Sequence, residues 1–427
     1  MRFESLDQWL HWQEGLHPNR IELGLERIRP VSDRLGVTKL SCSVITVGGT
    51  NGKGSTVAML DAIYRADGYR IGCYTSPHLL RYNERICIDG AAASDRQLCE
   101  AFERVDDARG GIQLTFFEFG TLAALDLFER AGLDLMILEV GLGGRLDAVN
   151  LVDADVAAVC GVARDHTAWL GEDLGAIALE KAGIFRFGRP ALIGQRLAPA
   201  VLRDRAEALG ADVLQLGREY DWSYTEGGWQ WQPQGRAAVA LPPPSLMGTF
   251  QYDNAALACT VVDCLAERLP VSIGALHRGL QRVGLSGRFQ ILPGSPTWIL
   301  DVAHNPQAAE SLAANLRTYA CPGRLLAVFG VLSDKEVRSV VGPLLELVDS
   351  WYLTQPVDPR AMPVDDLADL LGGSDLLRVS CAEAQVESAM AMAAASAAAG
   401  DCILVFGSFS IVEAALRRYA MLGPAPV

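Results

Sequence analysis

The sequence lacks an uninterrupted apolar run of about 18 residues, the length that a membrane-spanning helix requires. Its first residues, Met1 to Asp7, include acidic side chains where a secretory signal would be basic and then apolar. An excess of positive charge is also missing, because the net charge is -14 and the sequence pI ≈ 5.0. Such a charge disfavours nucleic acid and anionic membranes as partners. We therefore expect a cytoplasmic protein whose partners are small molecules, with no nucleic acid and no membrane among them.

The ten cysteines form no CxxC pair and show no spacing that is typical of a metal site. Cys42, Cys73, Cys160 and Cys402 lie in apolar stretches, where a reduced thiol packs as a small hydrophobic side chain. This pattern argues against a disulfide framework and against a cysteine-ligated metal. It agrees with a reducing compartment.

A chain of 427 residues exceeds what one hydrophobic core usually serves, so two domains are expected. Near residues 283–288 two glycines follow a helical segment, and a new series of strands and helices begins. We place the boundary there, with a first domain over residues 1–285 and a second over residues 286–427. Residues 222–244 are rich in aromatics, glycine and proline, and they indicate a small β excursion within the first domain.

Apolar runs of strand length alternate with helical patterns along the whole chain, and these runs are apolar on both faces. That arrangement is typical of parallel sheets covered by helices on both sides, so the predicted fold class is α/β throughout. The predicted strands are Val44–Val47, Arg70–Tyr74, Leu135–Val140, Val156–Val162, Trp298–Val302, Leu325–Val331, Trp351–Thr354 and Cys402–Phe406, and the predicted helices include Thr121–Ala131 and Ala382–Ala399.

The most informative segment is residues 44–56, where β-branched residues run into a glycine-rich turn with Lys53, and a helical pattern follows. Glycines let backbone N–H groups converge on phosphate oxygens, the helix presents its positive end, and the lysine adds a mobile charge. The usual phosphate-loop pattern fails twice, because Val47 replaces a glycine and Gly54 separates the lysine from Ser55. A glycine-rich turn without a ligand is the alternative. The joint presence of strand, loop, lysine and hydroxyl favours a phosphate loop.

Polar side chains also follow several predicted strands, where open α/β sheets collect groups that bind ligands. Glu139 closes a wholly apolar run, so a cation partner is expected for its carboxylate. With Ser76 and His166 it supplies oxygen and nitrogen donors that suit Mg²⁺, although imidazole is an unusual ligand for this ion. Taken singly, Ser76 also fits an ordinary Ser-Pro turn, and His166 also fits a loop histidine. Lys181 ends a predicted helix, and a plain helix-end cation is its default interpretation.

Together these motifs closely resemble the folylpolyglutamate synthase family of Mur-ligase-like amide ligases, and above all its bacterial bifunctional members that are also dihydrofolate synthases. The resemblance covers nearly the whole chain, and so many ordered matches make it very specific. It implies a P-loop NTPase-like ATPase domain followed by a Rossmann-like domain. The matching segments are residues 21–27, 48–55, 76–78, 116–121, 139–147, 165–167, 180–185, 287–289, 301–306 and 406–409.

The resemblance implies ATP and Mg²⁺ as cofactors, with Lys53, His166 and Lys181 in the catalytic machinery. Lys181 would be carbamylated and would help to bind a second Mg²⁺, and Ser76, Glu139 and His166 would be the other magnesium ligands. Without the family context, Arg288 would be read as a linker anchor and Asp301 as a helix cap. The residues expected to bind ATP are Thr50, Asn51, Gly52, Lys53, Gly54, Ser55, Asn254, Arg288 and Asp301.

The implied reaction joins the carboxylate of dihydropteroate, and then of tetrahydrofolate and its polyglutamates, to the amine of L-glutamate through an acyl phosphate, with ATP converted to ADP and phosphate. A monomer is expected. The second domain, including Ser408, is where the glutamate pocket is expected. The pterin is expected against Arg20, Ile21, Glu22, Leu23, Thr115, Leu146, Asp147 and Ala148.

Three other functions remain open at this point. A Mur ligase that builds peptidoglycan precursors shares the nucleotide loop, but it usually carries a separate N-terminal domain, for which the residues before Gly48 leave too little chain. A monofunctional folylpolyglutamate synthase is the second. The third, a P-loop switch that only hydrolyses nucleotide, would not need a second α/β domain supplying Arg288 and Asp301.

Overall fold

The structure is a computed structural model that describes residues 2–19, 21–38, 40–372 and 378–422. Its contacts divide the chain into two compact units. The main division follows Val283, close to the boundary predicted after residue 285, but two short segments that precede it, Arg164–Trp169 and Leu246–Phe250, also belong to the second unit. In the part of the chain that the structure describes, no helix has the length and apolar character needed to cross a membrane.

The first unit is built on a sheet of eight strands in the order β4-β3-β2-β5-β1-β6-β7-β8. All neighbouring strands are parallel except for the two pairs made by β3, which are antiparallel. The strands are β1 (Ser43–Gly48), β2 (Ile71–Tyr74), β3 (Ile86–Ile88), β4 (Ala91–Ala92), β5 (Leu135–Glu139), β6 (Val156–Val159), β7 (Pro190–Ile193) and β8 (Asp212–Gln215).

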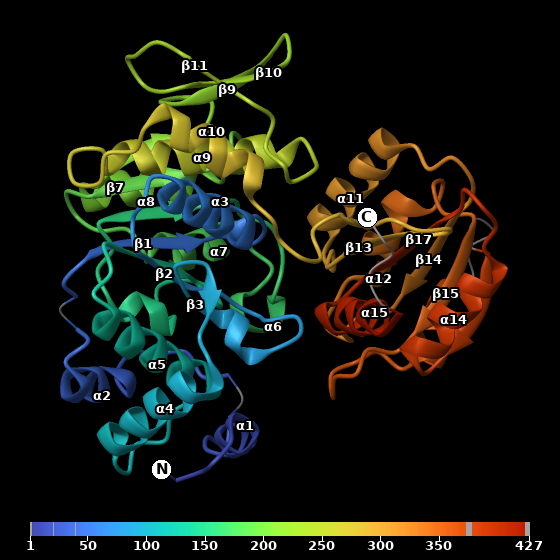
Figure 1. Cartoon of the computed structure of the whole chain (residues 1–427), viewed down its shortest axis with the longest axis horizontal. Helices are drawn as coiled ribbons and strands as arrows, with labels where there is room; N and C mark the ends of the chain where they lie inside the picture. Colours follow the sequence, from blue (N-terminus) through green and yellow to red (C-terminus); the bar gives the residue numbers. More distant parts are fainter. Residues whose placement is uncertain (1, 20, 39, 373–377, 423–427) are drawn as a thin grey trace. The chain divides into compact units, whose positions relative to one another are not determined.

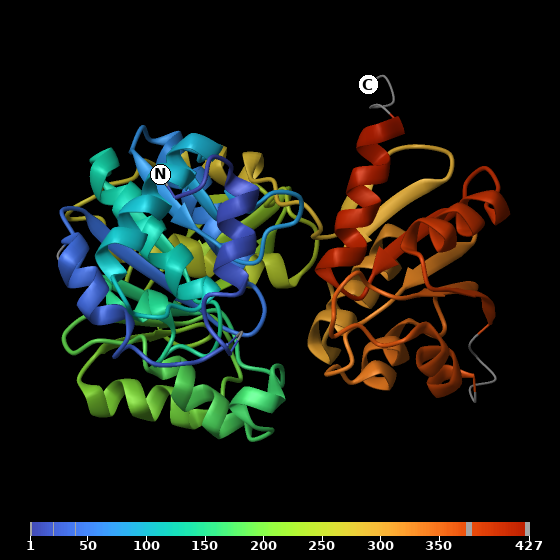
Figure 2. The ribbon, with the colours of Figure 1, turned by 90° about the horizontal axis from the view of Figure 1, so that it is seen from below.

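Helices cover both faces of this sheet, as the ribbon shows from two sides (Figures 1 and 2). A separate sheet of three antiparallel strands packs beside the last two helices of the first unit (Figure 1). Its strands are β9 (Asp221–Thr225), β10 (Gly228–Gln232) and β11 (Val239–Leu241). The helices are α1 (Leu6–Glu14), α2 (Ile28–Leu35), α3 (Lys53–Ala66), α4 (Asp95–Arg109), α5 (Phe116–Ala131), α7 (Leu174–Ala182), α8 (Ala200–Leu209), α9 (Phe250–Cys264) and α10 (Ile273–Arg282). The short helix α6 (Thr167–Leu170) lies mostly in the segment that belongs to the second unit.

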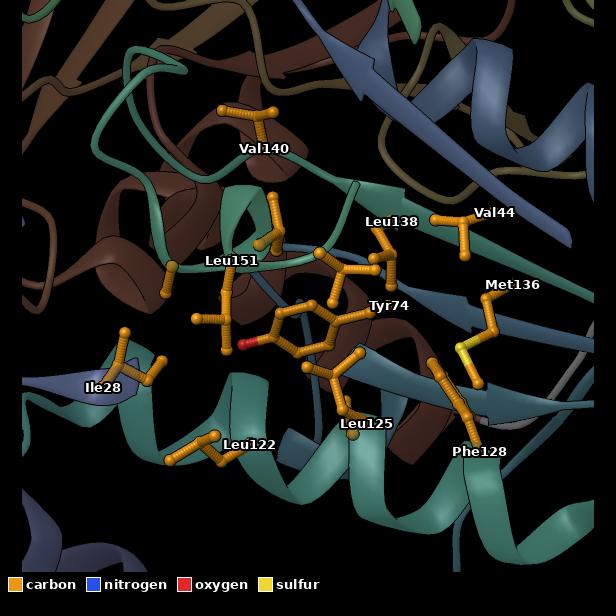
Figure 3. Close-up of a cluster of buried hydrophobic side chains, with 14 of the residues drawn as sticks. Ile28, Val44, Tyr74, Leu122, Leu125, Phe128, Met136, Leu138, Val140 and Leu151 are labelled. Carbon is orange, nitrogen blue, oxygen red and sulfur yellow. The ribbon is translucent and has the colours of Figure 1, made fainter. Parts of the chain in front are cut away.

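The core of the first unit follows from the alternation of side chains along the strands. Figure 3 shows Met136 and Leu138 of β5 pointing toward Leu125 and Phe128 of α5, and Tyr74 of β2 fills the space beside them. All five side chains are buried. Burial of this kind, at roughly 1.5–3 kcal/mol for a large apolar side chain, fixes the sheet against the helices. The carboxyl ends of β1, β2 and β5 are thereby held at one edge.

The second unit is a sheet of six strands in the order β12-β13-β17-β14-β15-β16, parallel except for β12. The strands are β12 (Gln290–Leu292), β13 (Thr297–Asp301), β14 (Leu325–Phe329), β15 (Ser350–Thr354), β16 (Val379–Glu383) and β17 (Cys402–Phe406). The helices are α11 (Pro306–Tyr319), α12 (Val337–Val341), α13 (Val364–Leu371), α14 (Val386–Ser396) and α15 (Phe409–Leu422).

The predicted α/β class with mostly parallel sheets is confirmed, and the predicted β excursion corresponds to β9–β11. The helix predicted over Ala382–Ala399 was partly wrong, because Ala382 and Glu383 lie in β16 and the helix starts at Val386. Alanine favours a helix, but backbone pairing with β15 decides the conformation of these two residues. Strand β6 stops at Val159 rather than continuing to residue 162.

Candidate active site

The loop after β1 has the shape that a phosphate cradle requires. Gly49 and Gly52 have φ of 139° and 89°, a region that side-chain-bearing residues rarely adopt. A Cβ atom on Gly52 would lie 2.6 Å from Asn254 Oδ1, and one on Gly49 would lie 3.1 Å from the backbone N of Cys160. Helix α3 begins directly after this turn, at Lys53, so the N-terminus of the helix faces the loop.

Lys53 lies over the loop, where its Nζ donates to the carbonyl oxygens of Gly49 and Thr50, both at 3.1 Å. Thr50 is tied to the segment after β6, because its N donates to Gly161 O at 2.8 Å and its Oγ1 donates to Ala163 O at 3.1 Å. These bonds explain why β6 ends early. Its continuation leaves the sheet to support the phosphate loop.

Helix α9 supplies a second wall to the loop. Gln251 is 1% exposed, and its Nε2 donates to Ser55 Oγ at 3.4 Å. Asn254 Nδ2 donates to Gln251 Oε1 at 3.0 Å, so the two amides form one chain of hydrogen bonds that ends on the loop. Asn254 was predicted from the resemblance, whereas Gln251 was missed. The buried hydroxyl of Ser55 thus accepts a hydrogen bond from α9.

Two of the predicted magnesium ligands meet at the edge of the first sheet. Glu139 ends β5 and is 5% exposed, and its Oε2 accepts a hydrogen bond from the backbone N of Ser76 at 3.1 Å. Within the described residues no three His, Cys, Asp or Glu side chains form a metal-binding group. A cation here would therefore take its remaining ligands from other donors, such as phosphate oxygens and water.

Lys181 lies in the last turn of α7 and is 3% exposed. The backbone of residues 143–147 packs against this turn: a Cβ atom on Gly144 would lie 3.1 Å from Lys181 Cα, and Arg145 N donates to Glu180 O at 2.8 Å. Nearly complete burial of a lysine is unusual for a plain helix-end cation. The default interpretation of this lysine is therefore weakened.

His166, the third predicted magnesium ligand, belongs to the second unit and has a positive φ of 52°. Its neighbour Asp165 is held by three groups of that unit: Lys335 Nζ at 2.6 Å, Asn305 Nδ2 at 3.1 Å and His304 Nε2 at 3.4 Å. Burial opposes ionisation, but His304, His166 and Lys335 hold the pKa of the Asp165 carboxyl well below its usual range.

Lys335 was not singled out from the sequence, although composition contained a signal. Of the 37 basic residues only four are lysines, namely Lys39, Lys53, Lys181 and Lys335. A lysine that is rare in a chain rich in arginine is a candidate for a role that needs a compact ammonium or a reactive amine. The side chain of Lys335 is only 7% exposed, which agrees with such a role.

The predicted ATP residues of the second unit lie together. Asp301 ends β13, and its carboxylate accepts from the backbone N of Phe289 and of Ala303, both at 2.8 Å. Burial raises the pKa of Asp301, and the nearby charge of Arg288 opposes this rise. The guanidinium of Arg288 stands 5.4 Å from the ring centre of Phe409. Asp301 therefore offers a hydrogen-bonded carboxylate, and Arg288 offers a cation that lies near an aromatic ring.

The segments predicted to hold the pterin are joined within the first unit. Arg27 donates to Glu22 and, at 3.0 Å, to Glu118 of α5, and Gly24 N donates to Leu146 O at 3.1 Å. Thr115 caps α5, since its hydroxyl accepts from Glu118 N at 3.3 Å. Ile21 and Leu23 are partly buried between these contacts, whereas Arg20 lies outside the described residues.

Asp147 belongs to the last of the segments predicted to hold the pterin, residues 146–148, and its carboxylate holds the local backbone by hydrogen bonds. Its carboxylate accepts from the backbone N of Leu142 at 2.8 Å and of Val149 at 3.0 Å, and Ala148 opens a short 3-10 helix behind it. Burial raises the pKa of Asp147 to about 6, against the opposing effect of these hydrogen bonds. The role of each pterin-segment residue stays a prediction.

Comparison with known proteins places these features in a family. The Mur ligase, glutamate ligase domain matches residues 287–409. The dihydrofolate synthase/folylpolyglutamate synthase of Escherichia coli (strain K12) is 43% identical over 407 residues, which cover 95% of this chain and 94% of that protein. The protein of the same name from Mycobacterium tuberculosis is 33% identical over 410 residues, which cover 88% of this chain and 82% of that protein.

Solved structures of similar proteins support the same family assignment. E. coli FolC in complex with DHPP and ADP has 42% sequence identity and a TM-score of 0.92, and the match covers 98% of each chain. A bifunctional folylpolyglutamate synthase/dihydrofolate synthase with Mn, AMPPNP and L-glutamate bound has 43% identity and a TM-score of 0.89 at the same coverage. This chain therefore belongs to the dihydrofolate synthase/folylpolyglutamate synthase family of ligases.

Proposed function

We propose that the protein is an ATP-dependent amide ligase that adds L-glutamate to dihydropteroate, giving dihydrofolate, and adds further glutamates to tetrahydrofolate and its polyglutamates. The observation that carries this proposal is the similarity over 95% of the chain to an enzyme named for both reactions. The ligands of the solved relatives, ADP with DHPP in one and AMPPNP with L-glutamate in the other, support the same set of substrates.

A carboxylate is a poor electrophile, so the substrate carboxylate first attacks the γ-phosphoryl group of ATP, giving an acyl phosphate and ADP. The amine of glutamate then attacks the acyl carbon, and phosphate leaves. Transfer of a phosphoryl group needs positioning and neutralisation of charge more than a covalent catalyst. We propose that Lys53 and the N-terminus of α3, which begins at Lys53, perform that task.

The donor set fits a hard divalent cation, because Glu139 offers a buried carboxylate and the backbone N of Ser76 is bonded to it. We propose Ser76, Glu139 and His166 as the protein ligands of Mg²⁺. When bound, the ion neutralises charge that develops on the phosphate oxygens. Asp165 fixes the loop that carries His166, through Lys335 and Asn305.

We also propose that Lys181 is carbamylated and helps to hold a second Mg²⁺. Its burial supports this, because a buried amine is more readily kept neutral, and only the neutral amine reacts with CO₂. The product is an anionic carbamate, which supplies an oxygen ligand in place of a cation.

For glutamate we propose the carboxyl edge of the second sheet, where Ser408 follows β17 and Lys335 follows β14. The Ser408 hydroxyl lies at the start of α15 and accepts from Ile411 N at 3.3 Å.

A cytoplasmic monomer remains our proposal. All ten cysteines fall in the described part of the chain and none forms a disulfide, which agrees with a reducing compartment.

Arg27→Met is expected to raise the KM for dihydropteroate by about tenfold, because the substrate segment around Glu22 loses its anchor to α5. The KM for ATP should change little. Steady-state kinetics with each substrate varied in turn measures both values. Arg34→Met is a matched control, because Arg34 lies in α2, the helix that follows Arg27, and donates to backbone oxygens of α4. An unchanged KM for dihydropteroate in Arg27→Met would refute this role.

The proposal is tested by offering the purified enzyme dihydropteroate and tetrahydrofolate separately, each with glutamate and ATP. Glutamylated product from both is the expected result. Product from tetrahydrofolate alone would leave a monofunctional folylpolyglutamate synthase. Product from neither, with activity on a peptidoglycan precursor instead, would favour a Mur-type ligase.

A further inference from the structure

Three aromatic side chains of the small sheet form a box around Tyr252, near the start of α9. The ring of Tyr252 stacks on Trp222 of β9, with a centroid distance of 5.0 Å and an interplanar angle of 24°. Tyr224 and Trp229 close the box edge-on, at 5.2 Å and 5.7 Å. Aromatic pairs at these distances add to the stability given by burial alone. The first turn of α9 is thus fastened to the three-stranded sheet.

A polar anchor accompanies this packing. The indole Nε1 of Trp222 donates to Asp253 Oδ1 at 2.7 Å, a strong hydrogen bond because the acceptor is a carboxylate. The guanidinium of Arg196 also lies 5.9 Å from the centre of the Trp222 ring, and Arg196 forms an ion pair with Asp221. The orientation of the Trp222 ring is therefore determined by three independent contacts.

The same turn of α9 carries the residues that shape the phosphate loop. Successive helical side chains point about 100° apart, so neighbours face different partners. Tyr252 and Asp253 contact the small sheet, whereas Gln251 bonds to Ser55 and Asn254 stands against Gly52. A Cβ atom on Gly52 would lie only 2.6 Å from Asn254 Oδ1, so a small shift of the turn would alter the loop.

We propose that Trp222 is a positioning residue for the nucleotide: through Tyr252 and Asp253 it sets the first turn of α9, and through Gln251 and Asn254 that turn sets the phosphate loop. The ligand affected is the phosphate chain of ATP or ADP. This inference rests on the proposed function only in that the loop binds adenine nucleotide.

Trp222→Phe tests the inference, because it keeps a stacked ring and removes the indole N–H. Trp231→Phe is the matched control. Trp231 lies in the same small sheet, and its Nε1 donates at 3.1 Å to Thr260 Oγ1, farther along the same helix. Both variants lose one indole hydrogen bond to α9. Trp222→Phe loses it at the first turn of the helix, which contacts the phosphate loop, whereas Trp231→Phe loses it farther along the helix.

The measurements are the Kd of ADP with Mg²⁺ by calorimetry and the midpoint of thermal unfolding. Trp222→Phe should weaken ADP by about tenfold, the size of effect that one lost hydrogen bond to a charged group produces. Trp231→Phe should leave the Kd within about twofold, since its lost bond affects stability without reaching the loop. Asp253→Asn, which keeps an acceptor for the indole but removes its charge, should weaken ADP binding less than Trp222→Phe does.

Equal weakening in both tryptophan variants, or an unchanged Kd in Trp222→Phe, would overturn the inference and leave the proposed function intact. If Trp222→Phe does not fold, Asp253→Leu removes the same hydrogen bond and carries the same expectation. A wild-type protein that binds no ADP would overturn both proposals.

Discussion

Lys53→Ala is expected to lower kcat by about a hundredfold to a thousandfold, the loss found when one preorganised charge-stabilising donor is removed. The ammonium is the one mobile cation on the phosphate loop, where it now bonds to Gly49 O and Thr50 O. Charge develops on phosphate oxygens in the transition state, so its loss affects chemistry more than binding. Rates at saturating ATP, dihydropteroate and glutamate measure the effect.

The thermal unfolding midpoint of Lys53→Ala should stay near that of the wild type, because the bonds it loses lie in a part-buried loop and no core contact changes. Lys53→Arg is a useful companion, since a planar guanidinium cannot replace a compact ammonium at this site, and it should also be impaired. Near-wild-type turnover of Lys53→Ala at saturating ATP would contradict the assignment.

The second large effect is expected for Lys181. Lys181→Met keeps an unbranched apolar stem in a site that is 3% exposed, so the fold should persist, but no carbamate can form. We expect kcat to fall by about a hundredfold, because one oxygen ligand of the proposed second metal is lost. Turnover and unfolding are measured side by side to separate activity from stability.

Lys181→Arg distinguishes a carbamate from a simple cation. Arginine keeps the positive charge and does not react with CO₂, so this variant should be as inactive as Lys181→Met. Carbon-13 NMR of the wild type in labelled bicarbonate should show a carbamate resonance that is absent from both variants. Full activity of Lys181→Arg, or an unmodified amine in active, metal-loaded enzyme, would reject the carbamylation.

Local chemistry made part of the site predictable. The phosphate loop could be placed because β-branched residues, glycines and Lys53 are contiguous, and each has a clear physical task in binding phosphate. Glu139 could be singled out because an acid at the end of an apolar strand requires a partner. The structure shows the backbone N of Ser76 as one partner, and the predicted cation stays a prediction. Residues such as Asn254, Arg288 and Asp301 came from the family resemblance, since nothing in their local sequence marks them.

The features that could not be predicted from the sequence depend on contacts between residues that are far apart in the chain. Gln251 acquires its role only because α9 packs against a loop about 200 residues earlier. Trp222 looked like part of a minor β excursion, and its bond to Asp253 appears only when sheet and helix meet. Ala382 was assigned to a helix on propensity, and pairing with β15 overruled that preference.

In a ligase of this kind, ATP is expected to be cleaved only when an amide is made. The most direct test follows ADP release by the wild-type enzyme with dihydropteroate and glutamate supplied together, singly and not at all. We expect ADP release equal to the dihydrofolate formed when both are present, and only background release when either is missing. ADP release at the full rate without either substrate would contradict it and would identify a nucleotide hydrolase instead.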